Sequence, residues 1–151
     1  MTDKSISITG KTNRYQMKRV TQERQTEQIN TSGSQIELLT DATTKINIVA
    51  KIRGYKQQDL LKGRETDLSC EQVLSMMREV ELKCRYCLCD MLVKYETVRE
   101  MRQWTVDRFD NDIGHVFTNC HLACLSCNLK RRRKSDAAFL FTKQLTICKT
   151  L

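Results

Sequence analysis

Apolar and polar positions are mixed without a sustained period over the first part of the chain. Residues 1–36 are mostly Thr, Ser, Gln, Lys, Arg and Glu, with isolated apolar positions between them. Such a segment buries too little apolar surface to offset the conformational entropy that it would lose on ordering. We therefore expect a flexible polar tail over residues 1–36, followed by an N-terminal extension over residues 37–82.

Two segments of this extension show apolar periodicity. Residues 45–53 carry Ile46, Ile48, Ala50 and Ile52 at every second position, which favours a short strand, although so short a segment is also compatible with a helix. Further on, Ser69 and Gln72 form a capping box. The apolar residues behind this box share one helical face and predict a helix near residues 70–82; they are Val73, Leu74, Met76, Met77 and Val80.

The second half of the chain shows a strand, loop, strand and helix pattern. Residues 104–106 and 120–123 are predicted to form the strands of a hairpin, with a polar, Gly-containing loop between them and a helix from Ser126 onward. Ser135 and Asp136 can cap a last helix within residues 135–151. Ala138, Phe141 and Leu145 have a spacing suited to docking that helix on the core. The expected fold class is α+β.

Four of the eight cysteines form two C-x-x-C pairs, which are Cys84 with Cys87 and Cys124 with Cys127. A C-x-x-C turn presents two thiolates from one side, so two such turns can complete the tetrahedral ligand set of zinc. We therefore predict one structural zinc ion. The alternatives are burial of the four residues as inert thiols, and replacement of a ligand by Cys89 or Cys120.

Charge is divided unevenly along the 151 residues, a length that fits one domain. Residues 1–82 hold 13 Lys and Arg against 11 Asp and Glu, a net of +2, and residues 83–151 hold 13 against 7, a net of +6. A basic surface attracts polyanions, which favours nucleic acid over a membrane, with solubility alone as the alternative. Since the chain shows neither a secretory signal nor a membrane-spanning apolar run, we expect an intracellular protein of the nucleus or cytoplasm that is not secreted.

The pattern over residues 84–134 resembles the HNH endonucleases of the zinc-clamped ββα type, which include a phage enzyme that resolves branched DNA. The residues that carry the resemblance are the two C-x-x-C pairs, Asp107 on the first strand, Asn119 in the middle and Asn128 directly after Cys127. It implies a treble-clef-like core over residues 83–134 that hydrolyses DNA. The wider layout is similar to uncharacterised proteins of large DNA viruses, which would place the protein in an infected host cell.

The resemblance also implies roles for individual residues. A catalytic Mg²⁺ or Mn²⁺ ion would be held by Asp107 and Asn128, with Asp110 as a further ligand or as an alternative base, and Asn119 would tie the loop by hydrogen bonds. The family's general-base His is replaced by Arg108, which cannot accept a proton and is assigned to phosphate binding. His115 on the loop is then the candidate base. The alternative is a ββα unit that binds DNA without hydrolysis.

Five consecutive cations, Lys130, Arg131, Arg132, Arg133 and Lys134, are expected to extend the helix after the second C-x-x-C pair and to contact phosphates. A nuclear localisation signal or a solvated helix end are the alternatives. The resulting hypothesis is a metal-dependent DNA endonuclease that acts on double-stranded or branched DNA as one chain or as a homodimer. The rival is a non-catalytic zinc finger that regulates replication or transcription, and a zinc-stabilised protein-interaction module is disfavoured.

Overall fold

The computed structural model describes residues 35–146, and the predicted tail lies outside them except for Gln35 and Ile36. These residues form an α+β fold, which confirms the predicted class. Two 3₁₀ helices, Glu37–Thr40 (η2) and Phe117–Asn119 (η3), accompany helices α2 (Ala42–Leu61), α3 (Cys70–Glu79), α4 (Leu125–Arg131) and α5 (Asp136–Gln144) and strands β1 (Trp104–Arg108) and β2 (Cys120–Cys124).

The predicted strand over residues 45–53 is wrong, because these residues lie inside the 20-residue helix α2. Asp41 caps this helix by accepting a hydrogen bond from the Thr44 amide at 3.1 Å. Its buried positions follow a helical spacing and are Thr44, Ile48, Ile52 and Asp59. The apolar residues at every second position therefore do not share one face, and Ile46 is 68% exposed.

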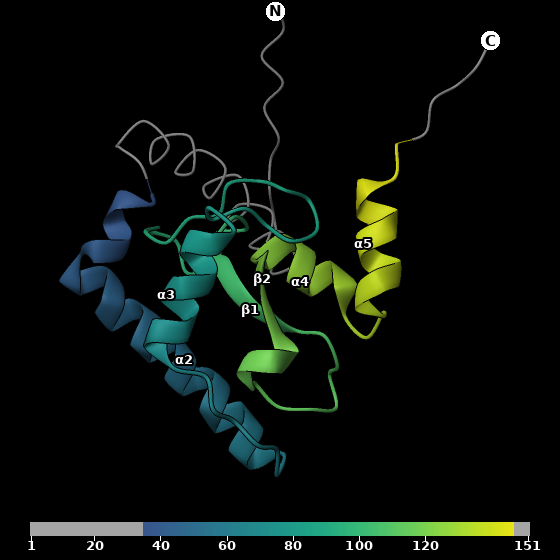
Figure 1. Ribbon diagram of the computed structural model, residues 1–151, viewed down its shortest axis with the longest axis horizontal. Helices are drawn as coiled ribbons and strands as arrows, with labels where there is room; N and C mark the ends of the chain where they lie inside the picture. The colour runs from purple at the N-terminus through teal and green to yellow at the C-terminus, as the bar shows by residue number, and fades with distance from the viewer. Residues whose placement is uncertain (1–34, 147–151) are drawn as a thin grey trace, which may run out of the picture.

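Helix α3 confirms the predicted capping box, in which Ser69 and Gln72 exchange side-chain and backbone hydrogen bonds. The helix ends at Glu79, earlier than expected, and Val80 is half exposed while the other four predicted apolar residues are buried. Helices α2 and α3 pack against each other on one side of the hairpin, and α4 packs on both strands (Figure 1).

Strands β1 and β2 pair antiparallel, with Asp107 opposite His121 and Arg108 opposite Cys120. The hairpin and the helix behind it match the predicted pattern, and both strands extend slightly further than expected. Trp104 is buried with 2% exposure in a core shared with α2 and α3, whereas Phe109 at the end of the hairpin is 38% exposed. Trp104 is thus a core residue.

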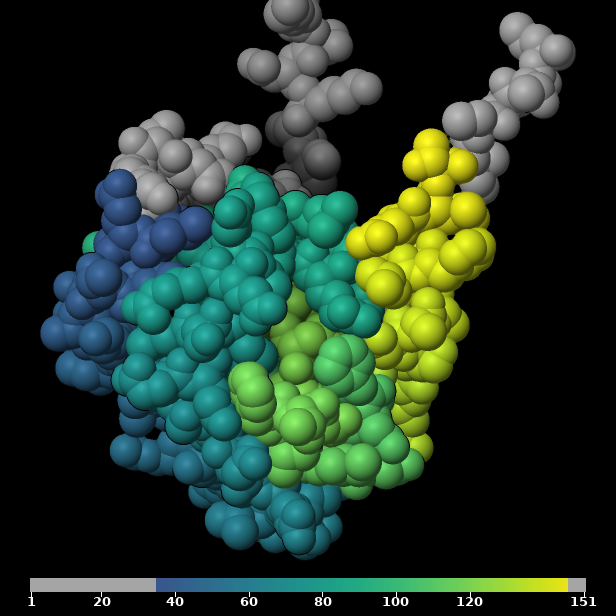
Figure 2. Space-filling model, viewed as in Figure 1, coloured from purple at the N-terminus to yellow at the C-terminus, as the bar shows by residue number. Residues whose placement is uncertain are grey.

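Ser135 caps helix α5 as predicted, but the docking face differs from the prediction. Phe139 is buried, whereas Phe141 and Leu145 are 69% and 51% exposed and Ala138 is also exposed. The ring of Phe139 contacts that of Tyr86 edge-on, with centroids 4.7 Å apart. Figure 2 shows α5 at the edge of the molecule opposite α2. Over the part of the chain that is described, no helix combines the length and apolar character needed to cross a membrane.

A matched pair of substitutions tests the helical assignment of α2. We expect Ile48→Ala to lower the free energy of unfolding by ~2–5 kcal/mol, because it removes a core side chain. Ile46→Ala should change it by less than ~0.5 kcal/mol, since Ile46 is exposed. Urea denaturation measures both. Similar losses in the two variants would contradict the helix, because residues 46 and 48 would share a face only in a strand.

Candidate metal centre and cleft

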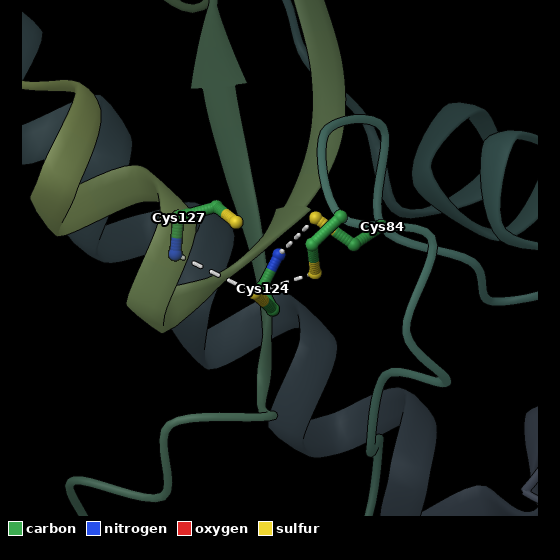
Figure 3. A group of neighbouring side chains, drawn as sticks. Cys84, Cys124 and Cys127 are labelled. Atoms are coloured by element: carbon green, nitrogen blue, oxygen red, sulfur yellow. Dashed lines mark hydrogen bonds between the residues drawn. The ribbon is translucent and has the colours of Figure 1, made fainter. Parts of the chain in front are cut away.

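The side chains of Cys84, Cys87, Cys124 and Cys127 converge, and their four Sγ atoms all lie within 4.8 Å of one another. Cys84 and Cys87 belong to a loop after α3. Cys124 ends β2 and Cys127 lies in the first turn of α4, and Figure 3 shows both of them facing Cys84. Four cysteines at this separation can hold a metal ion such as zinc. An ion bound there would join the loop to the hairpin and to α4.

Backbone geometry holds both C-x-x-C turns. In the first, the amide of Leu88 donates to the Cys84 carbonyl at 3.0 Å and the amide of Cys84 to the Cys89 carbonyl at 2.9 Å. Leu88 adopts φ 60°, a left-handed conformation that closes the turn. In the second, Cys124 is the N-cap of α4, and its Sγ accepts from the Cys127 amide at 3.4 Å. The amide of Cys124 itself donates to Cys84 Sγ at 3.3 Å.

The thiols of the cluster favour deprotonation at particular positions. Hydrogen bonds from Cys124, Cys127 and Cys89 lower the pKa of Cys84 far below its usual range. The hydrogen bond with Cys127 is the largest cause that lowers the pKa of Cys124 to about 7. Cys89 lies close enough to interact with these thiols, whereas burial raises the pKa of Cys120 to about 12. Burial raises the pKa of Cys87, and the hydrogen bonds with Cys124 and Cys84 raise that of Cys127. Because thiolates are the form that binds metals, metal binding by all four cysteines would release protons.

A cleft of about 1020 Å³ lies beside the hairpin. One wall is formed by α2 and the residues after it, the hairpin contributes β1 and its loop, and the other wall is α4 with the segment that follows it. Its lining holds eight Lys and Arg against three Asp. Burial lowers the pKa of Lys51 to about 7, and Arg131 is paired with Asp107. The remaining cations, which give the cleft its positive charge, are Lys62, Arg64, Arg108, Arg132, Arg133 and Lys134.

Asp107 lines the cleft and is also tied into the interior. Its Oδ2 accepts from Tyr86 Oη and from Arg131 Nη1, both at 2.8 Å, and lies 3.2 Å from His121 Nε2. Among residues 35–146, its Oδ1 accepts only the Arg108 amide, at 2.9 Å. Burial alone would raise the pKa of Asp107, but the hydrogen bonds from His121, Arg131 and Tyr86 lower it below its ordinary value. The carboxylate is therefore ionised.

Asn128 faces the same strand from α4. Its Nδ2 donates to Thr105 Oγ1 at 3.0 Å, which leaves its Oδ1 as an acceptor. Thr105 and Asp107 share one face of β1 because they are two residues apart. Asn128 and Arg131 share one face of α4 because they are three apart. The strand and the helix thus place Asp107 and Asn128 in the lining of the same cleft.

His115 lines the cleft and is anchored by α2. Both its backbone amide, at 2.7 Å, and its Nδ1, at 2.9 Å, contact Asp59 Oδ2. Its ring stacks on that of Tyr55 with centroids 4.6 Å apart. Burial lowers the pKa of His115 from its usual value, although the bond to Asp59 opposes this effect. The imidazole is therefore neutral at neutral pH.

The other predicted site residues hold the loop between the strands. Asn119 accepts from the Asp110 amide at 3.0 Å and donates to the carbonyls of Asp110 and Gly114 at 2.9 and 3.2 Å, which is the loop-tying role that the resemblance implied. Arg108 Nη1 donates to the carbonyls of Asn111 and Ile113, both at 3.1 Å. Asp110 is exposed and accepts from the Asp112 amide at 2.9 Å. Gly114 is required, because a Cβ there would lie 1.8 Å from the Glu65 carbonyl oxygen.

The basic run does not extend α4 as predicted. The helix ends at Arg131, and Arg132 turns the chain with φ 52°, so Arg132, Arg133 and Lys134 lie in the connection to α5. Arg131 is only 2% exposed, and it donates to Asp107 and to the carbonyls of Arg108, Phe109 and Lys134. A guanidinium bound on all sides is not free for phosphate, so its assignment to nucleic-acid binding is wrong. Lys130 is exposed but does not line the cleft.

Several residues that shape the site were not predicted from the sequence. Tyr86 lies between two cysteines, and its hydroxyl joins Asp107 to Asp136 of α5. His121 is 8% exposed and joins the same group, and its Nδ1 has no hydrogen-bond partner among residues 35–146. Asp59 lies far from the motif in sequence. Only the three-residue spacing of Arg131 from Asn128 could have indicated that it faces β1.

Comparison with known proteins gives one distant relative. An uncharacterised protein of Acanthamoeba polyphaga mimivirus is 28% identical over 100 residues, which cover 65% of this chain and 17% of the relative. The chain therefore matches about a sixth of the relative's length, and the match must extend beyond the 51 residues of the 84–134 segment. No protein-family model matches, and no solved structure matches. The expected likeness to a protein of a large DNA virus is confirmed.

The metal centre is tested by exchanging cysteines inside and outside the cluster. We expect native mass spectrometry to show one zinc ion per chain, which Cys84→Ser should lose together with a cooperative thermal transition, because it removes a ligand. Cys70→Ser, at a partly exposed thiol outside the cluster, should keep both. A folded wild-type protein that purifies without metal would contradict the zinc assignment.

Proposed function

We propose that the protein is a metal-dependent DNA endonuclease of the HNH type, in which the cysteine cluster holds a structural zinc ion. The observation that carries this proposal is that one cationic cleft is lined by Asp107, Asn128 and His115, on a hairpin and helix joined at the cysteine cluster. Exposed cations on both walls would contact the phosphates of duplex or branched DNA. Phosphate contacts position a duplex without reading its sequence.

The residues present fit a hard divalent cation such as Mg²⁺ or Mn²⁺. Oδ1 of Asp107 accepts a single backbone hydrogen bond, and Oδ1 of Asn128 is not used in its bond to Thr105. Both atoms are oxygen ligands of the kind that these ions prefer. When bound, such an ion would stabilise the negative charge that develops on the scissile phosphate and on the leaving 3′ oxygen.

The base in this proposal is His115. Its Nδ1 is occupied by Asp59, so Nε2 is the nitrogen that would accept a proton from the attacking water. The neutral form is the one required, and the lowered pKa of His115 supplies it at neutral pH. Arg108 would contact the phosphate through guanidinium nitrogens other than Nη1, which holds the loop. Hydrolysis would leave a 5′-phosphate and a 3′-hydroxyl end, as in the family that the chain resembles.

A second candidate function is DNA binding without hydrolysis. The observation that favours it is the pairing of Asp107 with Arg131 at 2.8 Å, both of them buried. This ion pair already compensates the carboxylate, and a divalent cation would have to share Asp107 with the guanidinium. In that case the cysteine-held unit would keep its cationic cleft and act as a nucleic-acid-binding protein.

Exchanges at Asn128 test cleavage without disturbing the Asp107 group. We expect Asn128→Ala to abolish cleavage of plasmid and branched DNA in Mg²⁺ or Mn²⁺, because an oxygen ligand is lost. Asn128→Asp should retain measurable cleavage, because it keeps an oxygen there. Zinc content and DNA affinity should be unchanged in both. Equal cleavage by Asn128→Ala and wild type would reject this metal site, and wild-type protein that binds DNA but cuts nothing would favour the second candidate.

Binding is tested by the salt dependence of affinity. We expect the double variant Arg133→Ser with Lys134→Ser to bind duplex DNA more weakly and to flatten the plot of log affinity against log salt by up to ~0.9 per lost phosphate contact. Lys130→Ser, which removes a neighbouring charge outside the cleft, should leave the slope close to that of wild type. Fluorescence anisotropy over a range of salt concentrations measures both. If Lys130→Ser flattens the slope more, DNA lies outside the cleft.

A further inference from the structure

Asp59 is a buried carboxylate that lies outside the HNH-like segment and contacts the proposed base. It lies near the end of α2 and is 1% exposed. No Lys or Arg of residues 35–146 forms an ion pair with it. Within the described residues, its side chain contacts the backbone amide and Nδ1 of His115, both through Oδ2. A buried carboxylate needs hydrogen-bond donors, so the contact with His115 is what makes its burial tolerable.

The geometry separates two tasks of this contact. The bond from the His115 amide fixes the backbone of the loop, which is also held by Asp67 through the Phe117 amide at 2.8 Å. The bond at Nδ1 instead acts on the ring. An ionised carboxylate can only accept, so the ring must carry its proton on Nδ1. The lone pair of the neutral imidazole is then on Nε2.

We propose that Asp59 is a positioning residue, which holds the His115 imidazole in the tautomer whose Nε2 accepts a proton from water. The inference rests on the proposed nuclease function, because a base is needed only if the protein hydrolyses DNA. It also makes α2 part of the active centre, so the N-terminal extension completes the site instead of only covering the hairpin.

The electrostatic surroundings of His115 agree with this assignment. Tyr55 stacks on the ring from α2, Arg108 opposes its protonation from β1, and Asp59 and Asp107 favour protonation. Asp67 lies nearby on the connection between α2 and α3, where it bonds the Phe117 amide. Burial outweighs the two aspartates, so the pKa of His115 lies below its usual value. Cleavage should therefore rise with pH through a pKa below ~6.5 and level off by neutral pH.

Asp59→Ala and Asp59→Asn form a matched pair of variants. Both bonds from His115 go to Oδ2, so Asp59→Ala removes the acceptor, whereas the side-chain oxygen of Asn can take the place of Oδ2 and still accept from the amide and from Nδ1. We expect cleavage at pH 7 to fall by ~10²–10⁴ in Asp59→Ala, the usual contribution of a positioned base, and to recover in Asp59→Asn, with zinc content, thermal transition and DNA affinity retained in both. Asp67→Asn, at the other anchor of the loop, should cleave as wild type does.

A readout that does not depend on activity is the tautomer itself. ¹⁵N-histidine NMR of the zinc-loaded protein should show His115 protonated at Nδ1 in wild type, in Asp67→Asn and in Asp59→Asn, whereas Asp59→Ala should lose this preference. A wild-type ring protonated at Nε2, or a tautomer unchanged by Asp59→Ala, would overturn the inference even if the protein cuts DNA. The expected tautomers in a protein that cuts nothing would instead overturn the proposed function, and Asp59 would remain the residue that orients the ring.

Discussion

The buried carboxylate of Asp107 is the contact that joins the first cysteine loop, the end of α4 and strand β2. It accepts from Tyr86 in the first cysteine loop and from Arg131 at the end of α4, and it contacts His121 on the paired strand. Tyr86 and His121 also contact Asp136 at the start of α5, so this helix belongs to the same group of contacts. Because every partner of this group is buried or half-buried, removing the charge would leave several polar groups unsatisfied at once.

This arrangement places a structural and a chemical demand on the same residue. The two carboxylate oxygens of Asp107 divide the demands, since Oδ2 carries the interior contacts and Oδ1 accepts a single backbone amide. In the proposed nuclease, replacement of the family's His by Arg108 fits the same division. Arg108 secures the loop by its bonds to the carbonyls of Asn111 and Ile113, and the proposed base, His115, is contacted by Asp59 of α2.

The N-terminal extension is integrated with the hairpin unit. Helix α2 supplies Asp59 and Tyr55 to His115, and the residues that follow α2 supply Lys62 and Arg64 to the cleft. The Glu65 carbonyl lies against Gly114, where no side chain larger than hydrogen fits. The match to the mimivirus protein also extends beyond the cysteine segment. We infer that residues 35–146 act as one structural unit, in which the segment over residues 84–134 depends on the helices before it.

The sequence by itself determined the elements whose signals are local. Paired cysteines at a fixed spacing, the Ser69 capping box and the Ser135 cap each act within a few residues, and each lies where it was predicted. The spacing of the isoleucines in α2 was ambiguous, because Ile46 does not follow the helical pattern of Ile48 and Ile52. The local signal for a helix is Asp41, which is its N-cap. Tertiary structure decided which of Phe139 and Phe141 docks α5, since both spacings suit a helix.

Tertiary structure also decided which charges are available. Five consecutive cations look equivalent in the sequence. In the fold, Arg131 at the end of α4 faces β1 and pairs with Asp107, whereas the turn at Arg132 places the three cations after Arg131 on the surface. His115 and Asp59 are 56 residues apart, and no spacing rule relates them. Ionisable groups acquire their roles from burial and from partners brought close by packing, whereas metal-binding turns and helix caps are written in the local sequence.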